Sequence, residues 1–321
     1  MKKHWYFILF MFLLLFIFTG CPNTESPDEI EEGPTPTPAP TPTPAPTLPP
    51  LPPIDLGGIE PEIIDCNIWH HLDLFMIFLE HPLDVENNMW GIGDITHYQQ
   101  CIYQVYMDSA FPLGWVWNWP TETENVKAYP EIIYGKKPWA LISTVTVLPA
   151  QIQKITEMQV TYDIDTYVEG TCNLSFDVWV NSDRAAVEGN ITHEVMIWLD
   201  NLGMDPISDN DPVLENIDGK DYYYFSGYAD HSVGWMYHAF VIEDTGGHDT
   251  IKNFTDTINI LEFFDYLTTL EEKNIPNTDY ISSIEFGNEI VNGLGNTTLY
   301  EYSVAVSTQE PEPEPTPTPL N

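Results

Sequence analysis

The feature that most constrains the fold is a series of short stretches, between about residues 54 and 308, in which apolar and polar residues alternate. A period of two places neighbouring side chains on opposite faces of a β-strand. Turn-forming pairs such as Glu169-Gly170, Asp218-Gly219 and Gly246-Gly247 separate the stretches. The alternating stretches are residues 142–147, 158–162, 175–180, 194–199, 222–225, 235–241, 281–286 and 300–306. Many short strands joined by turns predict an all-β sandwich of two antiparallel sheets.

One segment has a helical pattern instead. Between Thr255 and Glu272, apolar residues recur at the spacing of one face of an α-helix. The members of this stripe are Ile258, Ile260, Leu261, Phe263, Phe264 and Leu267. We expect one amphipathic helix here, packed on the outside of a sheet, with its aromatic side chains in the core.

Composition limits the partners of the chain. The 321 residues are 43% hydrophobic and 13% aromatic, which is ample for the core of one domain of catalytic size. With Lys+Arg 10 and Asp+Glu 49, the formal net charge is -39. Nucleic acid and anionic membrane surfaces would repel such a protein, so neither is expected as a partner. A neutral or cationic ligand fits, and so does a salty or acidic habitat.

The N-terminus has the pattern of an export signal over residues 1–21. Lys2 and Lys3 precede an apolar run from Trp5 to Phe18, which is short for a membrane span. The run ends in Phe18-Thr19-Gly20-Cys21, which resembles a bacterial lipoprotein cleavage box, although Phe18 stands where a small aliphatic residue is usual. We expect lipidation of Cys21 and a membrane tether. Ordinary secretion is the alternative, and both place the mature protein outside the cytoplasm.

Both ends of the chain are of low complexity. Residues 22–53 and 309–321 are rich in Pro, Thr and acidic residues and cannot bury a core. We expect an extended linker at the first and a low-complexity tail at the second, with one globular domain at residues 54–308 between them.

The four cysteines allow one disulfide prediction. If Cys21 is lipidated, three remain, and an exported protein would pair two of them. Cys66 and Cys101 both flank the early strands, so we predict a disulfide between them and a buried thiol at Cys172. No metal site or cofactor is predicted, because no Cys or His cluster has ligand spacing.

The stretch from His193 to Asp200 is a strand with two different faces. Val195, Ile197 and Leu199 make an apolar face, whereas Glu194, Met196 and Trp198 make the other. A buried Glu without a partner is costly, so this second face needs an explanation. A sugar-binding cleft supplies one, with the indole as platform and the carboxylate as reactant. A two-sided buried strand with Glu194 in a salt bridge explains the stretch equally well.

Further acids stand beside aromatic residues. In residues 284–290, Glu285, Gly287 and Glu289 share a face, and Gly287 leaves room for a ligand to approach the backbone. Asp177 and Trp179 share a face of another strand. Paired carboxyl groups near aromatic platforms indicate glycoside hydrolysis, in which one carboxyl attacks or directs water and the other protonates the leaving oxygen.

With these motifs in order, the sequence resembles glycoside hydrolase family 12, the endo-β-1,4-glucanases with a β-jelly-roll fold. The resemblance spans Cys66 to about Tyr300. The motifs that carry it are Cys66-Asn67-Ile68-Trp69, Asn87 to Gly91, Val126 to Glu131 followed by Tyr134 to Trp139, Glu194 to Leu199, and Phe286-Gly287-Asn288-Glu289. Asn288 replaces the more frequent Thr, which leaves the glucan preference open.

The resemblance implies a role for each matching residue. Glu194 would be the nucleophile, Glu289 the general acid and then base, and Asp177 a support for the nucleophile. The family retains anomeric configuration, so the two carboxyl groups would lie ~5–5.5 Å apart. The residues implied to bind substrate are Trp69, Asn88, Trp90, Met196 and Trp198.

Two assignments have alternatives: the identity of the acid and the location of three tryptophans. Glu285 is the rival of Glu289, which the Gly-x-Glu context favours. Trp115, Trp117 and Trp119 share one face and belong either to the core or to an added sugar strip, and we favour the core for at least one.

The leading hypothesis is an exported, monomeric, retaining endo-β-1,4-glucanase acting on β-glucan polysaccharide without a cofactor. A xyloglucan-specific enzyme of the same family and a non-catalytic carbohydrate-binding jelly roll are the alternatives.

Overall fold

The computed structural model describes residues 50–54, 61–67, 71–73, 82–105, 110–121, 125–209, 211–228, 234–243 and 251–309. The predicted export signal, Cys21, nearly all of the predicted linker and the predicted tail beyond residue 309 lie outside this part of the chain, as does Trp69. Within it, no helix is both long and apolar enough to cross a membrane.

The strand pairings define an outer and an inner layer. The outer layer has the order β1 (Glu62–Cys66), β4 (Gln99–Gln104), β5 (Leu113–Trp119), β15 (Ile290–Thr308), β8 (Ile155–Asn181) and β13 (Lys252–Asn259). The inner layer has the order β2 (His71–Asp73), β3 (Asp84–Glu86), β6 (Glu131–Gly135), β14 (Tyr280–Gly287), β8, β9 (Ile191–Leu202), β12 (Met236–Ile242), β11 (Lys220–Tyr228) and β10 (Val213–Ile217). The short β7 (Ala150–Gln151) pairs with the start of β14.

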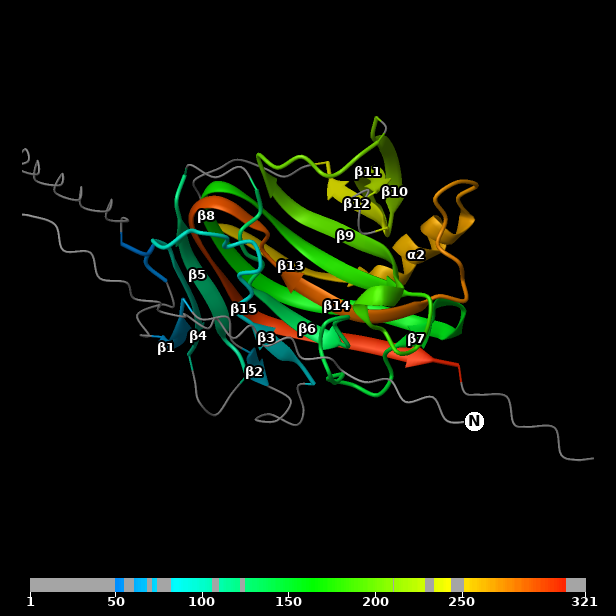
Figure 1. The fold of residues 1–321 in the computed structure, drawn as a ribbon, viewed down its shortest axis with the longest axis horizontal. Coiled ribbons are helices and arrows are strands. Elements are labelled where there is room, and N and C mark those ends of the chain that lie inside the picture. Colours follow the sequence, from blue (N-terminus) through cyan, green and yellow to red (C-terminus); the bar gives the residue numbers. More distant parts are fainter. Residues whose placement is uncertain are drawn as a thin grey trace, which may run out of the picture. The chain divides into compact units, whose positions relative to one another are not determined.

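Strand β8 belongs to both layers because it changes partners near Cys172. Its residues before that point pair with β15 and β13, and its later residues pair with β14 and β9. Figure 1 shows β8 and its partners running alongside one another through the centre of the domain. The predicted all-β jelly-roll sandwich is confirmed. One pair among the described strands, β9 with β12, is parallel.

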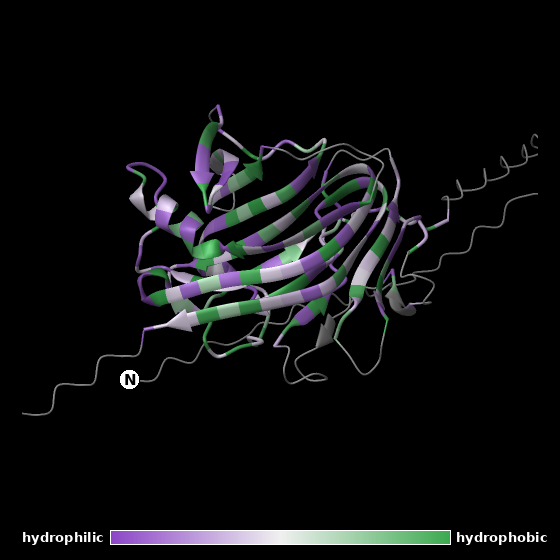
Figure 2. Ribbon diagram, turned by 180° about the vertical axis from the view of Figure 1, so that it is seen from behind, coloured by the Kyte–Doolittle hydropathy of each residue, from purple (hydrophilic) through white to green (hydrophobic). Residues whose placement is uncertain are grey.

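The core lies between the layers. Phe176 and Phe286 of the inner layer, 4.7 Å apart, meet Tyr162 and Tyr302 of the outer layer with ring centroids 5.8 to 6.3 Å apart. All four side chains are at most 2% exposed. Figure 2 shows the apolar and polar residues alternating along these strands, as expected of strands with one face in a core.

The helix is shorter than predicted. Helix α2 spans Ile260–Thr269 and contacts β8 and β10, and it buries Ile260, Phe263, Phe264 and Leu267. The prediction of a helix from Thr255 was wrong, because residues 252–259 form β13 and pair with residues 159–166 of β8. The open edge of β8 offers these residues a full ladder of hydrogen bonds, and β-branched Thr255 and Thr257 suit a strand.

Trp115, Trp117 and Trp119 are all in the core. Each is at most 1% exposed, which confirms the core interpretation and excludes the sugar strip. Trp117 covers Gly295 of the neighbouring β15 so closely that a Cβ there would lie 2.4 Å from the indole. Gly295 is therefore required by packing.

The predicted disulfide is confirmed. Cys66 and Cys101 are bonded across the ladder of β1 and β4, where they are direct partners. Cys172 is a buried free thiol, also as predicted.

The packing between layers predicts the cost of a core truncation. We expect Phe176→Ala to lower the free energy of unfolding by ~3–5 kcal/mol, because it removes contacts to both layers and leaves a cavity. Urea unfolding followed by fluorescence measures this. Phe254→Ala, at a partly buried position on β13, is the control and should cost clearly less. Equal losses would contradict the assignment of Phe176 to the shared core.

Candidate active site

The open face of the inner layer carries a cleft of about 810 Å³. Carboxyl groups and aromatic rings dominate its lining. The residues that line it are Glu86, Asn88, Trp90, Val126, Tyr129, Lys137, Trp139, Ala140, Asp177, Trp179, Glu194, Trp198, Met204, Asp205, Pro206, Ile207, Trp235, Tyr237, Glu285 and Glu289. Such a surface can stack sugar rings and place acids beside them.

The order of strands sets the order of side chains across the cleft. Glu86 of β3 and Lys137, which follows β6, lie at one end. Asp177 of β8 and Glu194 of β9 lie in the middle, and Tyr237 of β12 lies beyond them. Residues far apart in the sequence therefore line one groove across the strands.

Glu194 faces the cleft from β9, because the alternation of that strand places Val195 and Ile197 in the core. Its Oε2 accepts a hydrogen bond of 2.8 Å from Trp235 Nε1. Burial, against a lowering by the Trp235 hydrogen bond and with the charges of Glu289 and Glu285, raises the pKa of Glu194 to about 8. No cation pairs with Glu194 among the described residues, so the salt-bridge alternative is excluded.

Glu289 follows the end of β14 and is held by buried amides. Its Oε2 accepts a hydrogen bond of 2.5 Å from Asn173 Nδ2, and its backbone N–H donates to Asn173 Oδ1 at 3.0 Å. The next residue back, Asn288, donates to the Asn173 carbonyl at 2.9 Å and accepts from Trp115 and Thr297. Burial raises the pKa of Glu289 to about 7, against a lowering by Asn173. The acid is thus fixed in place.

Gly287 serves a different purpose from the one predicted. A Cβ at this position would lie 2.3 Å from the carbonyl oxygen of Pro130 and 3.0 Å from Glu131 Cβ. The carbonyl of Pro130 and the side chain of Glu131 therefore fill the space beside Gly287 in which the sequence analysis expected a ligand. The glycine lets the chain pass Pro130 immediately before it presents Glu289.

Asp177 lies on β8 between the strands of the other acids. Its direct cross-strand partners are Glu285 of β14 and Met196 of β9. It is 6% exposed, and its Oδ1 has no hydrogen-bond partner. Burial raises its pKa well above the ordinary value, and the charge of Glu194 raises it further. Asp177 and Glu194 are therefore coupled through their charges.

Glu285, the rival of Glu289, is engaged elsewhere. Its Oε1 accepts from Ser283 at 2.8 Å, and its Oε2 lies 3.4 Å from Lys137 Nζ. Both carboxyl oxygens of Glu285 are therefore engaged by neighbouring side chains.

The predicted substrate-binding residues divide into three groups. Asn88, Trp90 and Trp198 line the cleft, and Trp90 is 58% exposed, as a stacking platform would be. Met196 does not line it: its side chain is 1% exposed and its sulfur accepts a hydrogen bond from Tyr237, which covers it. Trp69 lies outside the described residues.

Several cleft residues escaped the sequence analysis. Trp235 bonds Glu194, and Trp139 is 46% exposed and packs edge-on against Trp179 at 4.9 Å. The sequence indicated the position of Trp179, because it shares a strand face with Asp177. The sequence analysis quoted Trp139 within a motif and Trp235 within a strand stretch but gave neither a role, because tertiary packing brings both to the cleft.

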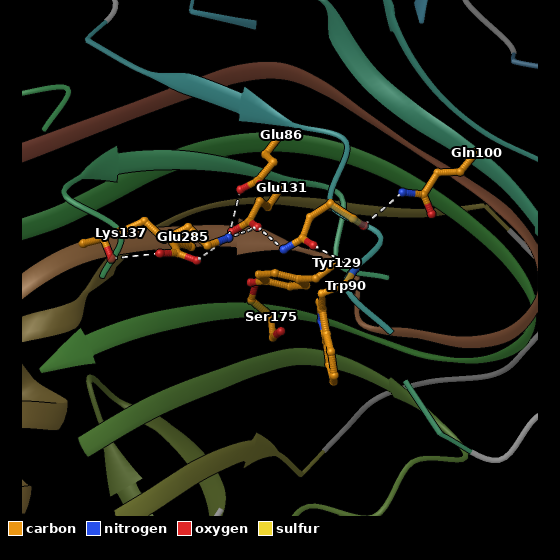
Figure 3. Close-up of polar contacts among 10 residues, drawn as sticks. Glu86, Trp90, Gln100, Tyr129, Glu131, Lys137, Ser175 and Glu285 are labelled. Atoms are coloured by element: carbon orange, nitrogen blue, oxygen red, sulfur yellow. Dashed lines mark hydrogen bonds and ion pairs between the residues drawn. The ribbon is translucent and has the colours of Figure 1, made fainter. Parts of the chain in front are cut away.

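A buried ion cluster closes one end of the cleft (Figure 3). Lys137 Nζ lies 2.5 Å from Glu131 Oε1, 2.9 Å from Glu86 Oε2 and 3.4 Å from Glu285 Oε2. Asn88 Nδ2 donates to the same Glu131 Oε1 at 2.9 Å. The described residues include no group of three or more His, Cys, Asp or Glu side chains suited to hold a metal ion.

A β-sandwich with paired, buried carboxyl groups in an aromatic cleft defines a glycoside hydrolase. Comparison with known proteins places it further. The model of glycosyl hydrolase family 12 matches residues 81–307, and the chain belongs to this family. Endoglucanase S of Pectobacterium parmentieri is 34% identical over 225 residues, covering 68% of this chain and 79% of that protein.

Solved structures agree with the family. A family 12 xyloglucanase from Bacillus licheniformis superimposes with a TM-score of 0.63 at 27% identity, covering 76% of this chain and 99% of that one. Endoglucanase Cel12A from Rhodothermus marinus gives a TM-score of 0.61 at 21% identity, covering 76% and 98%, which shows a shared fold.

The raised pKa of Glu194 predicts a stability cost that depends on pH. A folded-state pKa above the unfolded value stabilises the protein at low pH, and this stabilisation is lost as pH rises through the folded value. We expect Glu194→Gln to match the wild type near pH 5 and to be more stable by roughly 1–3 kcal/mol near pH 9. Thermal unfolding across this range measures the difference.

The control for this prediction is Glu301→Gln, on the exposed face of the outer layer. It should show no gain that grows with pH. A gain of equal size in both variants would show that the effect comes from total charge rather than from burial of Glu194.

Proposed function

We propose that the protein is a retaining endo-β-1,4-glucanase that cleaves internal bonds of glucan polysaccharides. The observation that carries this proposal is the placement of Glu194 and Glu289 in one aromatic cleft, each buried and each with a raised pKa. Two carboxyl groups facing one bond are what glycoside hydrolysis by double displacement requires.

In this proposal Glu194 is the nucleophile. Its ionised carboxylate attacks the anomeric carbon and forms a glycosyl ester while the leaving sugar departs. The Trp235 N–H stabilises the carboxylate charge before attack and orients one of its oxygens. Asp177 supports Glu194 from the neighbouring strand.

Glu289 is the general acid and then the general base. It gives its proton to the glycosidic oxygen in the first step, and in the second step it takes a proton from the water that cleaves the ester. Its hydrogen bonds to Asn173 hold the carboxyl in one orientation for both steps. Since Glu194 and Glu289 repel each other, one proton is shared by the pair in the active form.

The platforms in the cleft bind the sugar chain. Trp90 stacks a glucosyl unit on the non-reducing side, beside Asn88. Trp198, Trp235 and Tyr237 line the middle and the opposite side, where the remaining units would lie. Met196 takes part through Tyr237, which it supports.

A xyloglucan-specific activity is the second candidate. The 27% identical structure from Bacillus licheniformis is described as a xyloglucanase, whereas the 34% identical relative is an endoglucanase. Initial rates on xyloglucan, mixed-linkage β-glucan and carboxymethyl cellulose decide between them. A non-catalytic binding role is disfavoured, because stacking alone has no need of two buried acids.

We also propose export, with a lipid at Cys21 and the segment 22–53 as a spacer. This rests on the sequence pattern of residues 1–21. Mass spectrometry of the mature N-terminus measures cleavage and lipid addition.

Removal of either acid should abolish polymer hydrolysis. We expect Glu194→Gln and Glu289→Gln each to lower kcat on β-glucan by roughly 10³-fold or more, while thermal unfolding shows a folded protein. Proton NMR of the first product of the wild type should show the β-anomer. A first product in the α-form would exclude retention.

The roles of the two acids can be separated with a substrate whose leaving group needs no proton, such as a dinitrophenyl cellobioside. We expect Glu289→Gln to form the glycosyl ester rapidly with this substrate and to lose the alkaline decline that ionisation of Glu289, whose pKa burial raises to about 7, should cause in the wild type. Glu194→Gln should remain inactive with it. Equal inactivity of both variants would contradict the assignment of the acid.

A further inference from the structure

The cleft contains a strong excess of negative charge. Among the described residues that line it, six carry a carboxyl group and Lys137 carries the positive charge. Lys137 contacts Glu86 of β3, Glu131 of β6 and Glu285 of β14, whose side chains are at most 3% exposed. One ammonium therefore joins three adjacent strands of the cleft floor.

Stability alone does not account for this cluster. Buried ions lose their hydration, and apolar residues of similar volume often stabilise a fold as well or better. Three buried acids also exceed the charge of one lysine. Burial raises the pKa of Glu131 well above its ordinary value, although Lys137 lowers it, so Glu131 holds a proton more readily than a free acid.

Hydrogen bonds connect the cluster to Trp90, the proposed platform for a sugar ring. Glu131 Oε1 binds both Lys137 Nζ and Asn88 Nδ2, and Asn88 Oδ1 accepts a hydrogen bond of 3.1 Å from the backbone N–H of Trp90. Figure 3 shows Lys137, Glu131 and Glu86 close together, with the side chain of Trp90 nearby. The indole is exposed, so this chain of contacts fixes the backbone from which it projects.

Through Glu285, the cluster also lies next to Asp177 and the strand of Glu194, the proposed nucleophile. Glu285 is the direct cross-strand partner of Asp177, and Glu194 lies on the next strand. The charged groups around Asp177 are Glu194, Glu285, Glu289 and Lys137, and Lys137 alone among them lowers its pKa. The remaining titratable neighbours, Tyr129 and Tyr237, are buried with raised pKa values, and their hydroxyls donate to the Ser175 carbonyl and the Met196 sulfur.

We propose that Lys137 is a positioning residue for the reaction, which fixes the Trp90 platform through Glu131 and Asn88 and offsets the negative charge around Asp177 and Glu194. This inference rests on the proposed function of the same cleft. In this proposal Lys137 affects two quantities. One is the affinity for substrate on the non-reducing side, and the other is the pH below which activity falls, called the acid limb here.

The test compares Lys137→Met with Lys137→Arg and with the adjacent Lys136→Met. Lys136 donates to the Ala186 carbonyl and does not line the cleft, so it is a matched control. For Lys137→Met on mixed-linkage β-glucan, we expect KM to rise about tenfold. We expect the acid limb of kcat/KM to move to higher pH by about 0.5–1 unit.

The controls should separate charge from packing. Lys137→Arg should keep the acid limb of the wild type, and Lys136→Met should keep both KM and the limb. Glu285→Gln should move the limb to lower pH without a rise in KM, because it removes a negative neighbour of Asp177. Unchanged KM and limb in folded Lys137→Met would overturn the proposal. If that variant does not fold, an unchanged limb in Glu285→Gln would overturn it.

A binding measurement separates this proposal from the proposed function. Calorimetry with cellotetraose on Glu194→Gln and on the double variant Glu194→Gln/Lys137→Met needs no turnover. We expect about tenfold weaker binding in the double variant. Absence of hydrolysis by the wild type would refute the enzyme assignment, whereas equal affinity of the two variants would refute the role of Lys137 at the platform.

Discussion

The change of partners along β8 is the constraint on which both the core and the cleft depend. Before Cys172 the strand pairs within the outer layer, and after it within the inner layer. The same strand therefore supplies Tyr162 and Phe176 to opposite sides of the core, and it sets Asp177 between Glu285 and the strand of Glu194. A slip of one residue in this register would move Asp177 from the cleft into the core.

The cleft is chemically costly for the fold. Acids that are buried next to one another prefer to be neutral, as the raised pKa values of Asp177, Glu194 and Glu289 show. Hydrogen bonds from Trp235 and Asn173 compensate part of this cost, and Lys137 compensates part of it at the far end. The result is a groove that keeps several carboxyl groups buried side by side at a cost in stability.

Much of the fold could be predicted from the sequence, because strand alternation and turn residues act locally. The alternation placed Val195 in the core and Glu194 toward the cleft, and the positions of Cys66 and Cys101 indicated their disulfide. The helix was predicted to begin too early, since residues 255–259 were included in its apolar pattern but pair with the open edge of β8. The spacing of apolar residues does not show whether another strand, here β8, has a free edge with which the segment can pair.

The sequence by itself determined the all-β class, the apolar and polar faces of strands such as β9 and which acids stand beside aromatic residues, because these properties depend on neighbours along the chain. It did not determine every strand: the alternating stretch 142–147 forms no strand, and β13 was predicted as helix. Only the tertiary structure decided that Trp235 binds Glu194 across 41 positions and that Lys137 reaches Glu86 across 51. It also decided that Tyr237 covers Met196 and that Pro130 fills the space at Gly287. Such contacts follow from strand order and register, which are set by packing of the whole domain.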